Sequence, residues 1–175
     1  MASIDLVILG MVAEGPRSAY DIQKDVAYHH LDRWAHVSAP SIYKKVLRLR
    51  EEGYLQSKTV RGERLADKAV YSLTARGRTR LEELMLACAE EAVPLRFDFN
   101  VLIANLDKVD RAQAAMLIGR LRESLNQSAW VNAAQAAAYP ELPLTGKAVF
   151  DQQQRLYRAL LEWLDDFEAR FHGAG

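Results

Sequence analysis

A short run of basic and hydroxyl side chains is the part of this sequence whose residue types and spacing could do chemistry. One hydroxyl residue and three cations recur at three- and four-residue intervals, at Ser41, Lys44, Lys45 and Arg48. A helix would place them on one face. Such a face complements a polyanion, and an α-helix fits the major groove of DNA. An ordinary solvated helix has the same pattern, so the neighbouring sequence must separate the two interpretations.

The residues between these cations predict a helix that packs on its other side. Ile42, Val46 and Leu49 share an apolar face. Pro40 suits a first helical turn and Gly53 suits a C-terminal cap. We expect a short helix over residues 40–52, with Ser38 as the better candidate for its cap.

Two further helices must position the basic one. Residues 4–14 predict a first helix, which ends at Gly15-Pro16. Ser18 is the expected N-cap of a second helix that runs towards Leu31, with Asp21 in its first turn. Two helices, a turn and a basic third helix form the order of a helix-turn-helix unit.

A β-hairpin is predicted directly after the basic helix. Residues 54–60 and 68–73 are strand-like, and the polar turn 61–67 joins them. The tip of the hairpin carries Arg61, Arg64 and Lys68. A helix-turn-helix followed by a basic hairpin indicates a winged helix, in which the wing adds a second contact to phosphates.

The charge distribution supports this interpretation although the net charge is zero. Residues 38–80 contain eleven Lys and Arg against four Asp and Glu, whereas the rest of the chain contains twelve against nineteen. This asymmetry is typical of a basic working surface on an acidic body.

The rest of the chain predicts only helices. Thr74 should cap a helix that runs to Ala92, and a short helix should follow over residues 97–103. Asp107 is the expected cap of a long helix towards Tyr139, and Thr145 that of the last helix. The last helix carries a heptad-like seam that suits either an antiparallel hairpin or an intersubunit bundle: Val149, Gln153, Leu156, Leu160, Trp163, Phe167 and Phe171. The expected fold is mostly α (α+β), with a DNA-binding winged helix over residues 1–92 and a helical domain over residues 93–175.

Other functional classes find no support in the sequence. The single cysteine, Cys88, excludes an internal disulfide and fits a reducing, cytoplasmic compartment. The histidines lack the spacing of metal ligands, and there is no recognisable catalytic motif. No apolar run is long enough to span a membrane. We expect neither catalysis nor a cofactor, metal or membrane partner.

The chain resembles the PadR family of transcriptional regulators, well over about the first ninety residues and loosely thereafter. The resemblance lies in residues 6–16 (LVILGMVAEGP), 18–22 (SAYDI), 41–55 (SIYKKVLRLREEGYL) and 70–77 (VYSLTARG). Ala19, Pro40 and Lys44 stand where the family usually has Gly, Gly and Pro. The long tail with Phe97 and Phe99 is similar to the virulence-regulator-type branch.

The resemblance implies a homodimer, joined by the tail helices, that binds an inverted-repeat operator and acts as a repressor. Tyr20 and Tyr43 match tyrosines near DNA, although each could pack between helices instead. Arg48 can bind a guanine edge bidentately. The complete set expected at DNA is Tyr20, Ser41, Tyr43, Lys44, Lys45, Arg48, Arg61, Arg64 and Lys68.

The family also implies control by a small aromatic or phenolic effector. Four aromatic residues of the tail are candidates for its pocket: Phe97, Phe99, Trp130 and Trp163. The alternative function is a winged-helix protein-interaction module whose basic face docks an acidic partner without specific DNA binding.

Overall fold

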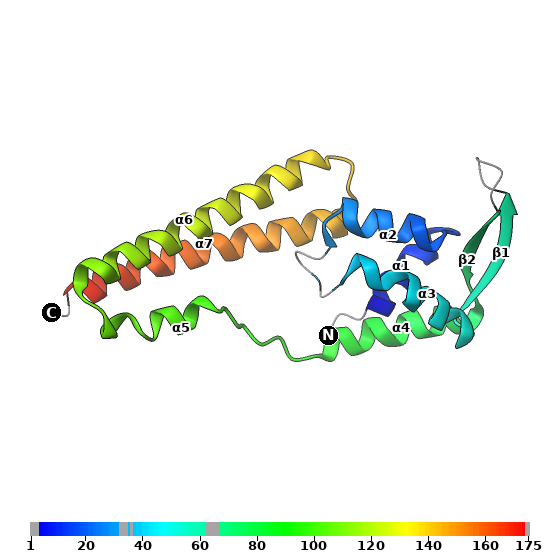
Figure 1. Ribbon diagram of the computed structural model, residues 1–175, viewed down its shortest axis with the longest axis horizontal. Coiled ribbons are helices and arrows are strands. Elements are labelled where there is room, and N and C mark those ends of the chain that lie inside the picture. The colour runs from blue at the N-terminus through cyan, green and yellow to red at the C-terminus, as the bar shows by residue number, and fades with distance from the viewer. Residues whose placement is uncertain (1–3, 32–34, 36, 62–66, 174–175) are drawn as a thin grey trace. The chain divides into compact units, whose positions relative to one another are not determined.

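The computed structural model describes residues 4–31, 35, 37–61 and 67–173. These residues form two compact units, 1–94 and 95–175 (Figure 1). Helices dominate both units, and the only sheet among the described residues is one antiparallel hairpin in the first unit. The predicted fold class, a mostly helical chain with an N-terminal winged helix-turn-helix, is confirmed.

The described residues of the N-terminal unit form four α-helices and the hairpin. In chain order they are α1 (Ile4–Glu14), α2 (Ala19–Tyr28), α3 (Ile42–Glu51), β1 (Leu55–Arg61), β2 (Asp67–Leu73) and α4 (Ala75–Glu90). The 3₁₀ turn η2 (Ala39–Ser41) leads into α3. The two strands form the wing, in which Leu55 pairs with Leu73 and Arg61 with Asp67.

One hydrophobic core holds this unit together. Helix α1 contacts α3, α4 and β2, while α2 packs on α3. Ile8, Ile22 and Ile42 bring one fully buried side chain each from α1, α2 and α3, and Leu55 and Tyr71 add the buried positions of the wing. The apolar face predicted for α3 is therefore the face that packs.

Local sequence signals fix the ends of these elements. Ser18 accepts a hydrogen bond from the Asp21 N–H, and the Asp21 carboxylate accepts from the Ser18 N–H, which completes a capping box at α2. Thr74 caps α4 in the expected way. Gly53 follows α3 with a φ of +78°, a conformation that favours glycine.

Gly77 is required by packing. A β-carbon at this position would lie 2.1 Å from the carbonyl oxygen of Tyr54, which no contact tolerates. The Thr74 hydroxyl also donates to the Gly53 and Tyr54 carbonyls, at 2.8 and 3.1 Å. The first turn of α4 is thus pressed directly onto the chain that leaves α3.

Arg17 ties the wing to the helices. Its backbone N–H donates to the Tyr71 carbonyl at 3.0 Å, and the Tyr71 N–H donates to the Arg17 carbonyl at 2.8 Å. Its guanidinium binds the carboxylates of Asp25 and Glu14 and the Met11 carbonyl. One residue therefore joins α1, α2 and β2.

Three local predictions in this unit are wrong. The Ser38 side chain makes no capping hydrogen bond, because the chain first forms η2 and α3 begins only at Ile42. Helix α2 ends at Tyr28 rather than near Leu31. Helix α4 ends at Glu90 rather than at Ala92, because Glu91 adopts an extended conformation.

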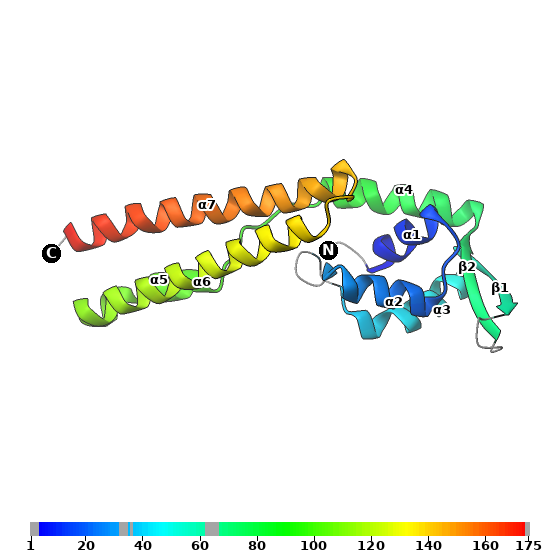
Figure 2. The ribbon, with the colours of Figure 1, turned by 90° about the horizontal axis from the view of Figure 1, so that it is seen from above.

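The C-terminal unit is a helical hairpin with a short helix packed on it (Figure 2). Its elements are α5 (Phe99–Ile103), the 3₁₀ turn η3 (Leu106–Lys108), α6 (Arg111–Ala138) and α7 (Leu144–Gly173). Helices α6 and α7 pack antiparallel, and Leu106, Ile118 and Leu164 are buried between the elements. Arg122 binds Asp165 and Glu168 at 2.8 and 2.6 Å across the hairpin.

The helix starts in this unit differ from the predicted ones. Asp110, not Asp107, caps α6 by accepting a hydrogen bond from the Gln113 N–H, while Asp107 lies in η3. Helix α7 begins at Leu144, so Thr145 lies inside its first turn and does not cap it. The predicted seam is partly intramolecular, because Leu160, Trp163, Phe167 and Phe171 pack against the hairpin core. Across the described helices, none combines the length and apolar character needed to cross a bilayer.

Candidate nucleic-acid interface

The buried face of α3 orients its polar side chains. Ile42, Val46 and Leu49 are at most 2% exposed, so the helix cannot rotate about its axis without exposing them. Two sets of outward positions lie on either side of this face. Tyr43, Leu47 and Arg50 follow i, i+4, i+7 spacing and form what we call the open flank. Lys45, Arg48 and Glu52 follow i, i+3, i+7 spacing and form the paired flank.

Three predicted DNA contacts from three elements meet in one groove. Tyr20 of α2, Tyr43 of α3 and Lys68 of β2 line a groove of about 340 Å³. Tyr20 is 71% exposed and Tyr43 is 60% exposed, so neither ring is part of the core. Of the two alternatives for these tyrosines, burial between helices does not match their positions.

The capping box of α2 provides the electrostatics of this groove. Asp21 lines it, and the Ser18 hydroxyl donates to its carboxylate at 2.7 Å. This hydrogen bond lowers the pKa of Asp21, with a further contribution from Lys68, whose Nζ lies 3.6 Å from the carboxylate. Lys68 is thereby held at the groove, while about half of its side chain stays exposed.

The paired flank is engaged with carboxylates of the same chain. Lys45 Nζ lies 3.2 Å from Asp5 of α1, and both side chains are partly buried. Arg48 Nε donates to Glu52 at 2.7 Å, and this hydrogen bond raises the pKa of Arg48. Both cations predicted on this flank therefore already have acidic partners.

The remaining predicted residues differ in exposure and in whether they bind other groups of the chain. Lys44 is exposed between the two flanks, whereas the Ser41 hydroxyl donates to the Ser38 carbonyl at 2.6 Å. Arg61 is exposed at the end of β1. Arg64 falls outside the described residues, as does most of the predicted turn 61–67.

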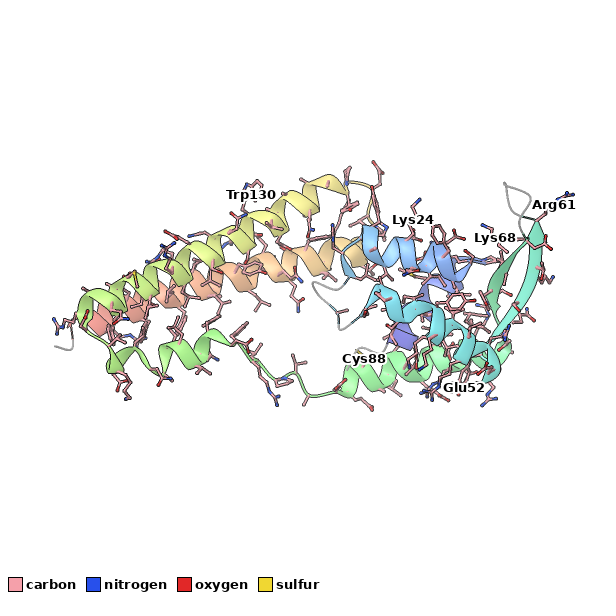
Figure 3. All side chains as sticks on the ribbon, in the orientation of Figure 1. Lys24, Glu52, Arg61, Lys68, Cys88 and Trp130 are labelled. Carbon is pink, nitrogen blue, oxygen red and sulfur yellow. The ribbon has the colours of Figure 1, made fainter. Side chains whose placement is uncertain are left out.

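Side chains on α2 and the wing point away from the side of the N-terminal unit on which Glu52 of the paired flank lies (Figure 3). Figure 3 shows Lys24, Lys68 and Arg61 along one side of this unit and Glu52, from the paired flank, on the opposite side. Lys24 was not among the predicted contacts. It lies four residues after Tyr20 and is exposed, so the i, i+4 spacing in α2 was the signal that could have found it.

The four aromatic residues predicted to line an effector pocket do not all come together. Phe97, Phe99 and Trp163 belong to one ladder of rings, with centroids 5.1 Å apart for Phe97–Phe99 and 6.1 Å for Phe99–Trp163. Phe167 and Phe171 continue the ladder along α7. Trp130 is 66% exposed on α6 and makes no ring contact with the ladder in the described part of the chain.

Within the described residues, no three His, Cys, Asp or Glu side chains are placed to hold a metal ion. Cys88 is exposed on α4.

Comparisons with known proteins agree on one family. Residues 8–83 match the Transcriptional regulator PadR-like family. Among curated proteins, none matches the sequence. The fold is similar to that of Bacillus subtilis PadR in complex with operator DNA, with a TM-score of 0.78, 18% identity and coverage of 95% of this chain and 96% of that one.

Two other solved structures have a similar fold. A PadR-like transcriptional regulator from Bacillus cereus gives a TM-score of 0.72 at 19% identity, covering 99% of this chain and 100% of its own. The virulence activator AphA of Vibrio cholerae gives 0.71 at 17% identity, with the same coverage. A structure of B. subtilis PadR has also been solved with p-coumaric acid, at 16% identity, a TM-score of 0.78 and coverage of 95% and 94%.

Proposed function

We propose that this chain, whose residues 8–83 match the PadR-like family of transcriptional regulators, binds specific DNA sequences as a homodimeric repressor. The observation that carries this proposal is the groove at which Tyr20, Tyr43 and Lys68 meet. A helix, a second helix and a wing there offer exposed rings and a cation on one surface. This is the surface on which a winged helix meets a duplex.

The polar residues of α3 and the wing take different roles at the duplex. Helix α3 enters the major groove, with Tyr43 and Lys44 outermost. Lys44, Lys45, Arg61, Arg64 and Lys68 serve phosphates. Arg48 is assigned to a guanine edge, and this contact requires its guanidinium to be shared with or released from Glu52.

Exposed apolar side chains support the homodimer. The C-terminal unit exposes large hydrophobic residues that its own core does not cover, at Val101, Met116, Trp130, Leu144 and Leu156. One α3 and one wing touch little DNA, so two copies related by a two-fold axis are needed for selectivity. We propose that residues 93–175 form the dimerisation domain and residues 1–92 the DNA-binding domain. Light scattering should give a dimer at micromolar concentration, and a monomer with and without DNA would contradict this assembly.

A small aromatic or phenolic effector is proposed to release the repressor. B. subtilis PadR, solved with p-coumaric acid, supports the ligand class by analogy. The ladder of Phe97, Phe99 and Trp163 supplies ring faces for stacking. A tenfold change in DNA affinity needs a difference of only about 1.4 kcal/mol between the two states. Titration of phenolic compounds should change tryptophan fluorescence and operator affinity together, whereas quenching alone would indicate a bystander site.

The experiment that tests DNA binding is a selection of bound sequences from random duplexes. The selected site should be an inverted repeat with half-sites about one or two helical turns apart. Its affinity, measured by mobility shift, should fall steeply with added salt. Failure to enrich any sequence, together with binding to an acidic protein partner, would favour the alternative of a protein-interaction module.

A further inference from the structure

The groove tyrosines define which way the DNA-facing surface points, and two cations outside the predicted set share their direction. Lys24 lies four residues after Tyr20 on α2, so it stands one turn along the same face. Arg50 lies seven residues after Tyr43 on α3, two turns along the open flank with an angular offset of only about 20°. Both side chains are exposed.

These two cations are available for an external anion. Neither Lys24 nor Arg50 forms an ion pair within the described part of the chain. The cations of the paired flank differ, because Lys45 and Arg48 are held by Asp5 and Glu52. An available cation gains a full charge-assisted contact with a phosphate, whereas an engaged one must first give up or share its carboxylate.

We propose that Lys24 and Arg50 bind DNA phosphates on either side of the Tyr20–Tyr43–Lys68 groove. Lys24 extends the phosphate-binding surface along α2, on the side of the unit where Lys68 and Arg61 also point (Figure 3). Arg50 extends it along α3 towards the wing, since β1 begins five residues later. This assignment rests on the proposed DNA-binding function and adds two phosphate contacts per protomer to it.

The number of phosphates contacted can be counted from the salt dependence of binding. The logarithm of the affinity falls with the logarithm of salt concentration by about 0.9 per phosphate contact. The fold decrease in affinity between 50 and 200 mM salt should therefore become smaller by a factor of about 3.5 for each contact that is removed. Removing two contacts should make it smaller by a factor of about 12 for each protomer bound to DNA. Contacts to phosphates affect all sequences alike.

The test compares two charge-matched double variants of the full chain. Lys24→Ala with Arg50→Ala removes the proposed contacts, and Lys147→Ala with Arg158→Ala removes one Lys and one Arg that are exposed on α7. Each is titrated with the selected operator and with a random duplex of equal length at both salt concentrations. All four positions are exposed, so thermal unfolding should be unchanged in both variants.

The expected result is a weaker salt dependence for the Lys24/Arg50 variant on both duplexes, with the control variant behaving like the wild type. A salt dependence equal to that of the wild type would overturn the assignment while leaving the proposed function intact. Equal reductions in the two variants would also overturn it, because net charge alone would then explain the effect. A wild-type chain that binds neither duplex would overturn the proposed function together with the assignment.

Discussion

The two flanks of α3 differ in what surrounds their outward side chains. The paired flank presents Lys45 and Arg48 to Asp5 and Glu52, at 3.2 and 2.7 Å. The open flank presents Tyr43 to a groove that it shares with α2 and β2. A cation on a helix is therefore a weak sign of DNA contact until its own acidic neighbours are known.

Ile42→Ala should have the largest effect, because both flanks depend on the same buried face of α3. Ile42 is fully buried, and truncation of such a side chain costs about 2–5 kcal/mol of folding stability. We expect a large fall in the midpoint of urea unfolding and loss of DNA binding. Tyr43→Ala is the control on the same helix, since it should lower DNA affinity with little change in unfolding. Similar stability losses in the two variants would mean that Tyr43 also supports the fold.

Arg48→Ala tests whether the paired flank reads sequence. If Arg48 binds a guanine edge, the variant should weaken operator binding by about 5- to 150-fold and relax one position of the site. Arg61→Ala should instead weaken all duplexes similarly and flatten the salt dependence. A repeated selection with each variant measures the difference. An unchanged sequence preference in Arg48→Ala would remove this arginine from base recognition.

Ser18→Ala removes the N-cap of α2, which lines the groove next to the open flank. The free energy of unfolding should fall by about 1 kcal/mol, the usual contribution of an N-cap. The loss should depend on pH because the Ser18 hydroxyl lowers the pKa of Asp21. A carboxyl group whose pKa is lowered by folding stabilises the fold at pH values above its ordinary pKa, near 3.9. This stabilisation is lost as the pH falls through the lower pKa of the folded state. The free energy of unfolding, measured with urea between about pH 5 and pH 2, should therefore decrease more steeply with falling pH for the wild type than for the variant. Parallel pH profiles would contradict the role of this hydrogen bond.

Asp5→Asn is expected to have the smallest effect. It removes the carboxylate charge opposite Lys45, an ion pair that contributes at most about 1 kcal/mol near the surface. The freed lysine should bind DNA at least as well as before, most visibly at low salt. A mobility shift at two salt concentrations measures this change. Weaker binding would show that Asp5 positions Lys45 for DNA.

Predictions from the sequence succeeded where the signal is local. Ser18, Gly53 and Thr74 act on backbone groups within three residues or on their own φ angle, so their types are sufficient. Asp107 and Asp110 both suit a helix start, and only the packing of Ala114 and Ile118 against the hairpin selects Asp110. The same holds for Thr145, which lies one residue inside α7.

The candidate interface was predictable in its elements and less so in its side chains. Helical spacing placed Lys45 and Arg48 on an outward face. It could not reveal that Asp5, forty residues earlier, lies beside Lys45, because that contact depends on how α1 packs against α3. Lys24 and Arg50 were left out of the predicted set, although their i, i+4 and i, i+7 spacing from Tyr20 and Tyr43 places each on the same helix face as a predicted tyrosine.

The contact beneath Gly77 makes α4 a mechanical lever. Helix α4 contains 16 residues and is thus about 24 Å long, and its first turn is pressed onto the Tyr54 carbonyl at the exit of α3. With that end as the pivot, a tilt of about 5° moves the other end by about 2 Å. A force applied near Glu90 would therefore act on the root of the wing and on α1, which packs against the same helix, and a side chain at position 77 would force the two surfaces at the pivot apart.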